Sequence, residues 1–336
     1  MSQNRERLLL VSEILKRDTN VDHPITSSEI IKKLKAEGIT ADRRSIYEDI
    51  RTLVDRGYDI CTYEENNRGY YLRETEFEFS ELRLLTDAVL SARFISASQS
   101  KEIVNKLKKL TNRYDESRLE NVSYLHKRIK CDNKAIFYNI DMLTEAIEKG
   151  CRVSFDYLKY TVARKMEKKD DAKRVVSPYS IIWMGDYYYL VCKYPKYESL
   201  SNLRLEKISN ITILDEPAEP VTNIAGFGNG LDIAEYANRH IHMFSGTEER
   251  IEVKCREEIL QAMQDRFGEE LKIKKQEGEY FWASVRTVRQ GMLYFVLQMA
   301  DGIEVVSPLD FRQEVADMLK KILNRYAEDR KTDVSG

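Results

Sequence analysis

Residues 174–194, RVVSPYSIIWMGDYYYLVCKY, restrict the possible folds more than any other part of the chain. Two runs rich in Val, Ile and Tyr flank the turn sequence Met-Gly-Asp, and each run has the length of a strand. This pattern predicts two antiparallel strands joined by a tight turn. The similar runs RVSFDYL (152–158) and NLRLEKISNITIL (202–214) predict further strands, for which a small antiparallel barrel is the simplest packing. The charged stretch at 159–174 predicts a solvated loop.

Length and composition limit the class of protein. A chain of 336 residues is longer than one typical domain, so we expect two or three cores. Its 42% hydrophobic and 33% charged residues are typical of a soluble globular protein. Apolar runs stay shorter than the ~18 residues of a membrane span. The N-terminus has charges around a short apolar patch and no small-residue cleavage site. We therefore expect a cytoplasmic protein with no membrane partner.

Residues that carry catalytic or metal chemistry are sparse in the sequence. Cysteines at the two-residue spacing of metal and redox motifs are absent, which predicts reduced, buried thiols at Cys61, Cys131, Cys151, Cys192 and Cys255. His240 and His242 would share one face of a predicted strand, but no third ligand lies near them in sequence. The sequence also lacks a glycine-rich phosphate loop and a nucleophile elbow. We therefore expect no metal, no cofactor and no enzymatic activity.

The N-terminal segment begins with the pattern of two short helices. Leu8, Val11 and Leu15 recur at helical spacing across residues 3–17. A second helix is expected to start at Thr26, because Glu29 three residues later completes a capping box. We expect it to end at Gly38, where a left-handed residue can close a helix.

A third amphipathic helix is predicted between Asp42, its expected N-cap, and Gly57. Its apolar positions are Ile46, Ile50, Leu53 and Val54. The runs DICTY (59–63) and GYYL (69–72), joined by EENNR, then predict a β-hairpin. Three helices followed by a hairpin predict a winged helix-turn-helix.

The polar face of the third helix predicts contact with DNA. An arginine near its N-terminus can pair with a guanine edge in the major groove, while others hold phosphates. Glu48 could accept from a cytosine amino group or orient a neighbouring arginine, and the acidic residues would limit indiscriminate phosphate binding. The predicted DNA-binding residues are Arg43, Arg44, Ser45, Tyr47, Glu48, Arg51 and, on the hairpin, Arg68.

The charge balance tests this interpretation. Residues 1–75 hold 13 Lys and Arg against 14 Asp and Glu, and the whole chain has a net charge of −2. DNA binding must therefore come from a local cluster, and protein–protein contact remains the alternative role for a winged helix. DRRSIYEDIRTL (42–53) followed by RGYYL (68–72) resembles the DeoR-type winged helix at the N-terminus of bacterial WYL-domain transcriptional regulators.

Three further helices are predicted between this segment and the strands. They lie in residues 79–96, with Ser80 as N-cap and Leu82, Leu85, Val89 and Leu90 on one face; in residues 100–114, with Ile103, Leu107 and Leu110; and in residues 139–150, ending at Gly150. Such helices could set the distance between two DNA-binding heads of a dimer. They could equally cover a core, so we assign them no site.

The strand-rich region carries the strongest resemblance. SPYSIIWMGDYYYLV (177–191) followed by LRLEKI (203–208) resembles the WYL domain, an SH3-like or Sm-like barrel, with Tyr188, Tyr189 and Leu190 at the positions that name the domain. Tyr188 stands where the family has tryptophan. The resemblance implies a sensor of nucleotides or nucleic-acid fragments. It places the ligand-binding candidates at Tyr157, Ser177, Tyr179, Tyr189 and Arg204, with Lys159 and Arg174 at the rim.

The chemistry of these candidates is coherent on its own. Arg204 offers a bidentate phosphate clamp, hydroxyl groups add hydrogen bonds, and tyrosine rings can stack on bases. A strand tyrosine more often packs than binds, so ordinary packing remains the alternative.

The C-terminal region predicts a small α+β domain. ERIEVKC (249–255), YFWASVRT (280–287) and MLYFVLQMA (292–300) read as strands, whereas residues 256–268 and 308–330 read as helices. The region, including GIEVVSPLDFRQEVADML (302–319), resembles the extension that commonly follows the WYL domain and that contributes to dimerisation in relatives.

Together these features predict a multidomain α+β protein. Its expected parts are a winged helix-turn-helix domain (1–75), a helical connector (76–140), a WYL β-barrel (141–220), a linker (221–246) and a C-terminal extension domain (247–330). The resemblance implies a homodimeric transcription regulator that binds an operator in double-stranded DNA and a single-stranded nucleic acid or nucleotide effector. The alternative is a non-regulatory accessory protein whose barrel binds single strands.

Overall fold

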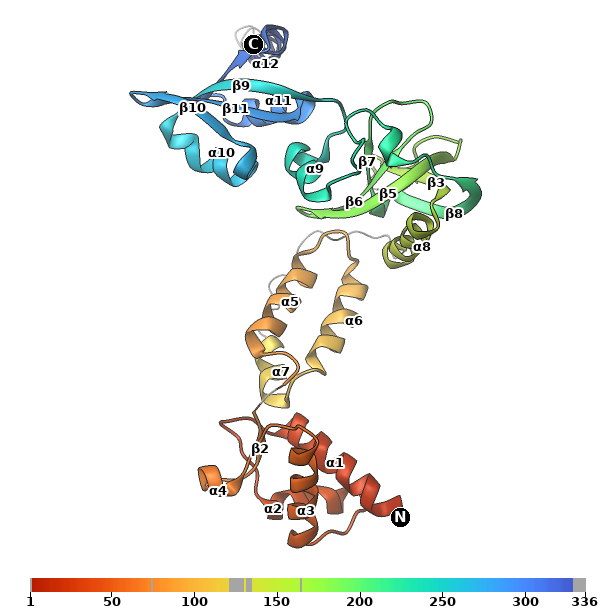
Figure 1. The fold of residues 1–336 in the computed structure, drawn as a ribbon, viewed down its shortest axis with the longest axis vertical. Coiled ribbons are helices and arrows are strands. Elements are labelled where there is room, and N and C mark those ends of the chain that lie inside the picture. The colour runs from red at the N-terminus through yellow and green to blue at the C-terminus, as the bar shows by residue number, and fades with distance from the viewer. Residues whose placement is uncertain (1, 74, 121–129, 131–134, 164, 329–336) are drawn as a thin grey trace, which may run out of the picture. The chain divides into compact units, whose positions relative to one another are not determined.

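The computed structural model describes residues 2–73, 75–120, 130, 135–163 and 165–328. After residue 134 the chain divides into two compact units (Figure 1). Each unit has its own hydrophobic core. None of the helices in the described ranges is long and apolar enough to cross a membrane.

The first unit begins with three helices around one core: α1 (Ser2–Asp18), α2 (Ser27–Ala36) and α3 (Arg43–Asp55). Val11, Ile30 and Ile46, one from each helix, are fully buried in it. The predicted capping box is present, because the Glu29 amide donates to the Thr26 hydroxyl and the Thr26 amide donates to the Glu29 carboxylate at 2.7 Å. These three helices agree with the sequence prediction.

A two-stranded hairpin follows α3. Strands β1 (Ile60–Cys61) and β2 (Tyr71–Leu72) pair antiparallel, as predicted, but a short helix, α4 (Tyr63–Asn66), occupies part of the expected loop. Ile25 and Tyr70 exchange backbone hydrogen bonds that tie the hairpin to the start of α2. Gly69 is required there, because a Cβ atom would lie 2.5 Å from the Ile25 carbonyl oxygen.

The rest of the first unit is helical: α5 (Phe79–Ser91), α6 (Ala97–Lys108) and α7 (Arg113–Glu120). The expected N-cap of α5 was wrong by two residues. The cap is Glu78, and its amide donates to the Glu81 side chain at 2.8 Å. Leu85 and Leu110, expected on apolar faces, are exposed, whereas Val104 is buried. Helix α7 was not predicted.

The second unit contains a curled antiparallel sheet. Its strands are β3 (Cys151–Tyr160), β4 (Met166–Lys168), β5 (Arg174–Met184), β6 (Tyr187–Lys193), β7 (Ser201–Arg204) and β8 (Ile208–Pro217). They run in the order β4-β3-β5-β6-β7, and β8 pairs with β3. The predicted turn lies at Gly185, where φ is +59°. Part of the expected loop is strand β4, and a 3₁₀ turn, η2 (Leu205–Lys207), splits the last predicted strand in two.

Helix α8 (Ile136–Lys149) packs on this sheet in the second unit, and it ends at Gly150 as predicted. Leu143 and Ala146 of α8 are fully buried against the sheet. The side-chain amide of Asn139 donates to the carbonyl oxygens of Leu205, at 3.3 Å, and Ile208, at 2.9 Å. These bonds fix the 3₁₀ turn that follows Arg204.

The segment expected as a linker carries short helices: η3 (Val221–Asn223), α9 (Ile233–Arg239) and η4 (Ile241–Met243). Tyr236 and Met243 from this segment are buried with Ile182 and Val191 of the β5–β6 hairpin. His240 ends α9 and His242 adopts φ +52°, so the expectation that they share a strand face was wrong. Clusters of three or more metal-ligating side chains do not occur among the described residues.

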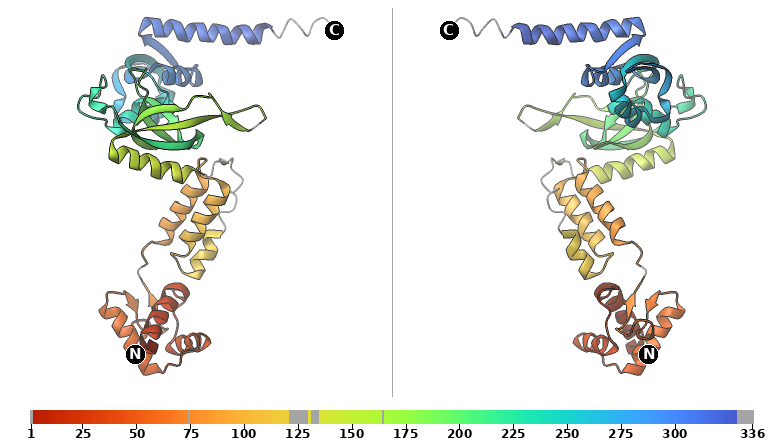
Figure 2. Two further views of the ribbon diagram at one scale, coloured as in Figure 1. Left: turned by 90° about the vertical axis from the view of Figure 1, so that its right-hand side faces the viewer. Right: turned by 90° about the vertical axis from the view of Figure 1, so that its left-hand side faces the viewer.

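The C-terminal domain is an antiparallel sheet with helices on one face. Its elements are β9 (Glu248–Arg256), η5 (Glu257–Ile259), α10 (Leu260–Phe267), η6 (Gly268–Glu270), β10 (Lys272–Glu277), β11 (Tyr280–Val288), α11 (Arg289–Gln298), β12 (Ile303–Ser307) and α12 (Leu309–Glu328). The sheet order is β10-β11-β9-β12. A β-α-β-β-α-β chain with this order is ferredoxin-like. Figure 2 shows α12 as a long additional helix.

Two errors in the predicted order have physical causes. The run MLYFVLQMA was expected as a strand, but most of it is in helix α11. Every residue from Met292 to Leu297 is apolar or aromatic, so the sequence shows no polar positions at helical spacing, and a short apolar run does not distinguish strand from helix. Strand β10 was missed because all six of its residues are exposed, which removes the alternating pattern.

The cysteines follow the prediction in part. Cys61, Cys192 and Cys255 are buried and Cys151 is half-buried, and all four are free thiols. Burial raises the pKa of Cys255 to about 12, which keeps this thiol protonated and unreactive. Cys131 lies outside the described residues.

Candidate functional sites

Helix α3 is fixed in place by one cap and one internal ion pair. The Asp42 carboxylate accepts from the Ser45 amide at 2.7 Å, and this bond lowers the pKa of Asp42. Asp49 is buried and receives two hydrogen bonds from Arg7 of α1, at 2.7 and 3.1 Å. The prediction that the acidic residues of α3 limit phosphate binding was therefore wrong for Asp49. Its role is to hold α3 against α1.

The opposite face of α3 is exposed and carries most of the predicted DNA-binding residues. Tyr47 is 50% exposed, and Arg43, Arg44 and Arg51 surround it on the same face. The Arg44 Nε lies 3.2 Å from the Glu48 carboxylate, one helical turn on. Arg43, Arg44, Tyr47, Glu48 and Arg51 therefore lie together, whereas Ser45 is half-buried with its amide engaged in the cap.

A groove runs beside this face. It has a volume of about 970 Å³ and is lined by the start of α2, by α3 and by α4. Arg43, Tyr47, Arg51 and Val54 form its α3 side. Val54 was expected in the core but is 43% exposed, because Ile46, Ile50 and Leu53 alone fill the buried stripe.

Arg68 lies on the hairpin, apart from these residues in the sequence. Its guanidinium donates to the Asp22 carbonyl oxygen at 3.1 Å. The Asn66 side chain accepts from the amides of Arg68, at 2.6 Å, and Gly69, at 2.9 Å, and so shapes the turn. Arg68 is exposed but already helps to hold the hairpin to the loop after α1.

In the second unit, Tyr157 lies between two arginines. The centre of the Arg174 guanidinium is 4.3 Å from the Tyr157 ring centroid, and the Tyr157 hydroxyl accepts from the Arg204 amide at 3.2 Å. Burial raises the pKa of Tyr157 to about 12, so its hydroxyl keeps its proton at neutral pH. Arg174 also donates to the hydroxyl of Tyr194 and the carboxylate of Asp170, both at 3.0 Å.

Arg204 is held more tightly than the sequence suggested. Its guanidinium pairs with the carboxylate of Glu206, which is 1% exposed, and lies 3.3 Å from the Tyr187 ring centroid. Burial alone lowers the pKa of Arg204, but Glu206 and Tyr187 outweigh it and raise the pKa. Tyr189 lies directly opposite Arg204 in the β6–β7 pairing. We call Tyr157, Arg174, Tyr187, Tyr189 and Arg204 the arginine–tyrosine cluster.

Three other predicted ligand residues lie elsewhere. Ser177 is 2% exposed, and its hydroxyl accepts from the Glu219 amide at 3.0 Å. The Tyr179 hydroxyl donates to the Glu219 carbonyl oxygen at 2.9 Å. Both hydroxyls therefore hold the chain after β8. Lys159 is exposed near the end of β3, opposite Glu167 of β4.

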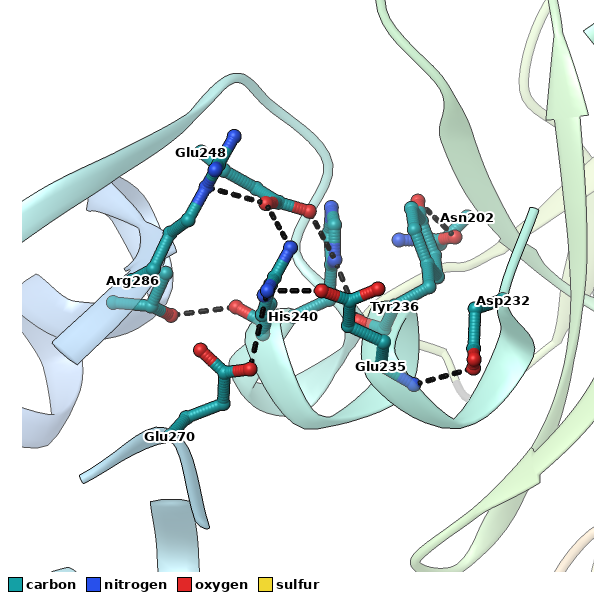
Figure 3. A network of polar contacts seen from close by, with 10 residues as sticks. Asn202, Asp232, Glu235, Tyr236, His240, Glu248, Glu270 and Arg286 are labelled. Atoms are coloured by element: carbon teal, nitrogen blue, oxygen red, sulfur yellow. Dashed lines mark hydrogen bonds and ion pairs between the residues drawn. The ribbon is translucent and has the colours of Figure 1, made fainter. Parts of the chain in front are cut away.

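A polar network that the sequence did not reveal joins α9 to the C-terminal domain (Figure 3). Arg239 of α9 pairs with Glu235, with Glu248 of β9 at 3.3 Å and with Glu270 of η6 at 3.1 Å. Arg286 of β11 also reaches Glu248, at 3.1 Å. On the other side of α9, the Tyr236 hydroxyl donates to Asn202 of β7 at 3.0 Å. The network therefore connects the two sheets of the second unit, although its residues lie far apart in the sequence.

The comparisons with known proteins match this architecture. The WYL domain model matches residues 138–213, and the WCX domain model matches residues 247–323. The chain therefore contains a WYL domain, as the sequence resemblance implied. In this chain a WCX domain follows the WYL domain.

Two solved structures are similar over much of the chain. One is proteasome accessory factor B/C (PafBC) of Arthrobacter aurescens, with 15% identity, a TM-score of 0.31 and coverage of 96% of this chain. This chain spans 48% of the length of that protein. The other is a CRISPR Cas-related protein, with 12% identity, a TM-score of 0.39 and coverage of 77% of this chain and 76% of that chain. No curated protein matches the chain.

Proposed function

We propose that this protein is a bacterial, DNA-binding transcription regulator, whose WYL domain binds a nucleotide or short nucleic acid and thereby changes operator binding. The exposed face of α3 is the observation that carries the proposal. Arg43, Arg44 and Arg51 surround Tyr47 there. The Asp49 carboxylate is buried against Arg7, so it adds no negative charge to this face. This gives a nearly neutral segment one locally basic helix face, which is what base readout in a duplex requires.

In this proposal the first unit is a winged helix-turn-helix domain. α3 enters the major groove, which is wide enough for a helix, and Arg44 near its N-terminus reaches a guanine edge. In this arrangement the sugar–phosphate backbone of one DNA strand lies in the groove beside α3, next to Arg43 and Arg51. Arg68 on the hairpin lies where it can contact the backbone or the minor groove. A homodimer would place two such helices on the two halves of an operator.

The arginine–tyrosine cluster is the proposed effector site of an SH3-like WYL barrel. Arg174 and Arg204 each pair with one carboxylate oxygen, and a phosphate is an oxyanion that arginine can bind in its place. The two arginines are not equivalent. Asp170 is 57% exposed and can be displaced by a phosphate, whereas Glu206 is buried beside Arg204. Arg174 is therefore the first phosphate ligand, and Arg204 positions Tyr157 and Tyr187.

An effector regulates DNA binding only if it favours one arrangement of the protein. A shift between DNA-competent and incompetent arrangements requires a differential affinity of a few kcal/mol. The exposed Asp170 costs little to displace, so in this proposal the difference comes from new contacts of the effector with Arg174 and Tyr157.

The test is fluorescence anisotropy of the full chain on duplex DNA from upstream of its own gene, beside a scrambled duplex. We expect Arg44→Ala to weaken specific binding by about 1 to 3 kcal/mol. Arg56→Ala is the matched control, because Arg56 is exposed at the end of α3 but lies outside the predicted reading face. Equal, salt-sensitive binding of both duplexes that Arg44→Ala leaves unchanged would contradict sequence reading by α3.

A further inference from the structure

The ferredoxin-like sheet of the C-terminal domain has one face that its helices leave uncovered. Ile251, Val253 and Cys255 of β9 alternate toward the buried core. Lys254 and Arg256 lie at the intervening positions, opposite Trp282 and Tyr280 of β11. Lys275 of the edge strand β10 lies opposite Trp282 on its other side. The uncovered face therefore has aromatic residues on an inner strand and basic residues on both neighbouring strands.

The lysines of this face lie over the aromatic rings. The Lys254 ammonium is 4.4 Å from the Tyr280 ring centroid and 5.3 Å from that of Trp282. The Lys275 ammonium is 4.1 Å from the Trp282 ring centroid. Both rings are partly exposed, so their faces are covered by mobile lysine side chains rather than by packed apolar groups.

Several carboxylates around this face already have basic partners. Glu252 pairs with Lys274, Glu277 with Lys275 at 2.9 Å, and Glu304 with Arg312. These pairs neutralise the acidic side chains. Arg256 also pairs with a carboxylate, that of Glu258 at 3.5 Å, so Lys254 contributes most of the positive charge beside the rings. The charge and the aromatic surface together favour a partner with phosphates and flat apolar rings.

We propose that this sheet face binds single-stranded nucleic acid, with bases stacked on Tyr280 and Trp282 and phosphates held by Lys254, Lys275 and Arg256. The proposal deepens the proposed function and rests on it for the class of effector, because it adds a binding surface for a nucleic-acid effector outside the WYL barrel. A sheet is flat enough to hold successive bases side by side. Four-stranded sheets with aromatic residues on their inner strands bind RNA in this way.

A duplex does not fit this surface, because its base faces are covered by stacking. Single strands expose them, and stacking on a protein ring accepts any base. The lysines can leave the rings and follow the phosphates, because their side chains are long and flexible. We therefore expect binding with little sequence preference and a strong dependence on salt.

The chain offers a direct optical test, because Trp183 and Trp282 are its 2 tryptophans. Trp183 lies on the tip of the β5–β6 hairpin, is 47% exposed and belongs to neither candidate site. Trp183→Phe leaves Trp282 as the single indole reporter. Titration of this variant with an oligothymidylate of about 12 nucleotides at low salt is expected to quench its fluorescence, as stacking requires.

The matched variant Trp282→Phe, which retains Trp183, is expected to show no quenching. Lys254→Gln in the Trp183→Phe background is expected to weaken binding roughly tenfold, a loss of about 1.4 kcal/mol. Unchanged Trp282 emission during measurable oligonucleotide binding, or quenching of Trp183 alone, would overturn the proposal. Quenching by duplex as strong as by single strand would also overturn it.

This test separates the new site from the proposed regulator function. Arg44→Ala is expected to leave Trp282 quenching unchanged while it weakens duplex binding. Failure of Trp282 to respond, with intact operator binding, would remove only the sheet site. Failure of operator binding, with intact quenching, would remove only the reading role of α3.

Discussion

The α3 face and the arginine–tyrosine cluster each contain an arginine–glutamate ion pair, and the two pairs differ in their exposure to solvent. The Arg44 side chain is 88% exposed and its partner Glu48 is 64% exposed, whereas Arg204 is 27% exposed and Glu206 is 1% exposed. An exposed ion pair contributes about 0 to 1 kcal/mol, because water solvates and salt screens both charges. Removing one partner of a buried pair costs about 3 to 5 kcal/mol. The same residue type therefore has different roles in the two regions.

In the proposed function, this difference determines how each region would bind an anion. Arg44 can leave Glu48 and reach a phosphate or base at little cost. If Arg204 left Glu206, the Glu206 carboxylate would stay buried without its charged partner, which is costly. The α3 face is thus adaptable and suits a long polyanion, whereas the cluster is preorganised and suits one small ligand in one orientation.

The largest expected effect follows from the buried pair. Arg204→Met leaves the Glu206 carboxylate buried without its arginine, so we expect it to lower the free energy of unfolding by about 3 kcal/mol. The measurement is urea unfolding in a Trp282→Phe background, in which Trp183 reports on the WYL domain. The double variant Arg204→Met with Glu206→Met is expected to recover much of the loss. Full stability of the single variant would show that this pair resembles the exposed one.

A second variant tests whether the first unit also contains a buried, structural pair. Asp49→Leu removes both hydrogen bonds from Arg7, and we expect it to destabilise α3 by about 2 to 3 kcal/mol. Hydrogen exchange of the α3 amides measures this locally. Arg7→Met with Asp49→Leu is the control, since it removes both charges. Unchanged exchange in Asp49→Leu would mean that the helix packing alone fixes α3.

The stability of the two units should depend on pH in different ways. Burial lowers the pKa of His240 to about 4, so the folded state keeps His240 neutral while the unfolded state gains a proton as the pH falls below about 6.5. Stability of the second unit is therefore lost between about pH 6.5 and 4, by about 2 kcal/mol at pH 5. Trp282 fluorescence during urea unfolding at pH 7 and pH 5 measures it.

His240→Asn is expected to reduce this loss. Asn can still donate toward the Tyr236 carbonyl oxygen, which the His240 Nδ1 contacts at 2.8 Å. In the first unit, Glu29 behaves in the opposite way. The hydrogen bond from the Thr26 amide lowers the pKa of Glu29. Glu29 therefore stabilises the first unit above about pH 4.5, and this stabilisation is lost only below that pH. An equal pH dependence in wild type and His240→Asn would contradict the assignment to His240.

The sequence predicted elements well where a local signal exists. The capping box of Thr26 and Glu29, the cap at Asp42 and the turn at Gly185 all follow from neighbouring residues. It predicted side-chain roles poorly where the partner is distant. Asp49 lies at helical spacing from Ile46 and Leu53, so periodicity places it on the buried face of α3. Its partner Arg7 is 42 positions away, so the sequence alone could not identify the ion pair.

The candidate site shows the same limit. Arg204, Tyr157 and Tyr189, which the WYL resemblance named together, are neighbours in the structure, and their role in binding a ligand stays a prediction. The burial of Glu206 beneath Arg204 was not expected, since it depends on the 3₁₀ turn that Asn139 of α8 holds. Arg239 and its carboxylates could not be found at all, because three separate elements supply them.

The smallest expected effect on stability belongs to Glu48. Because the Arg44–Glu48 pair is exposed, Glu48→Gln should change the stability of α3 by no more than a few tenths of a kcal/mol, measured by the same hydrogen exchange. Its effect on DNA binding should be clearer. The change removes a negative charge beside Arg44, so binding to a scrambled duplex should strengthen and its salt dependence should remain.

Discrimination between operator and scrambled duplex should then fall in Glu48→Gln. A specific contact to cytosine would be lost, and phosphate binding by Arg44 would no longer compete with the carboxylate. Glu37→Gln is the matched control, since Glu37 is an exposed acidic residue at the end of α2. If both changes strengthen binding to the scrambled duplex equally, Glu48 acts only through net charge. If Glu48→Gln alone reduces discrimination, the adaptable arginine of the α3 face depends on its acidic neighbour for specificity.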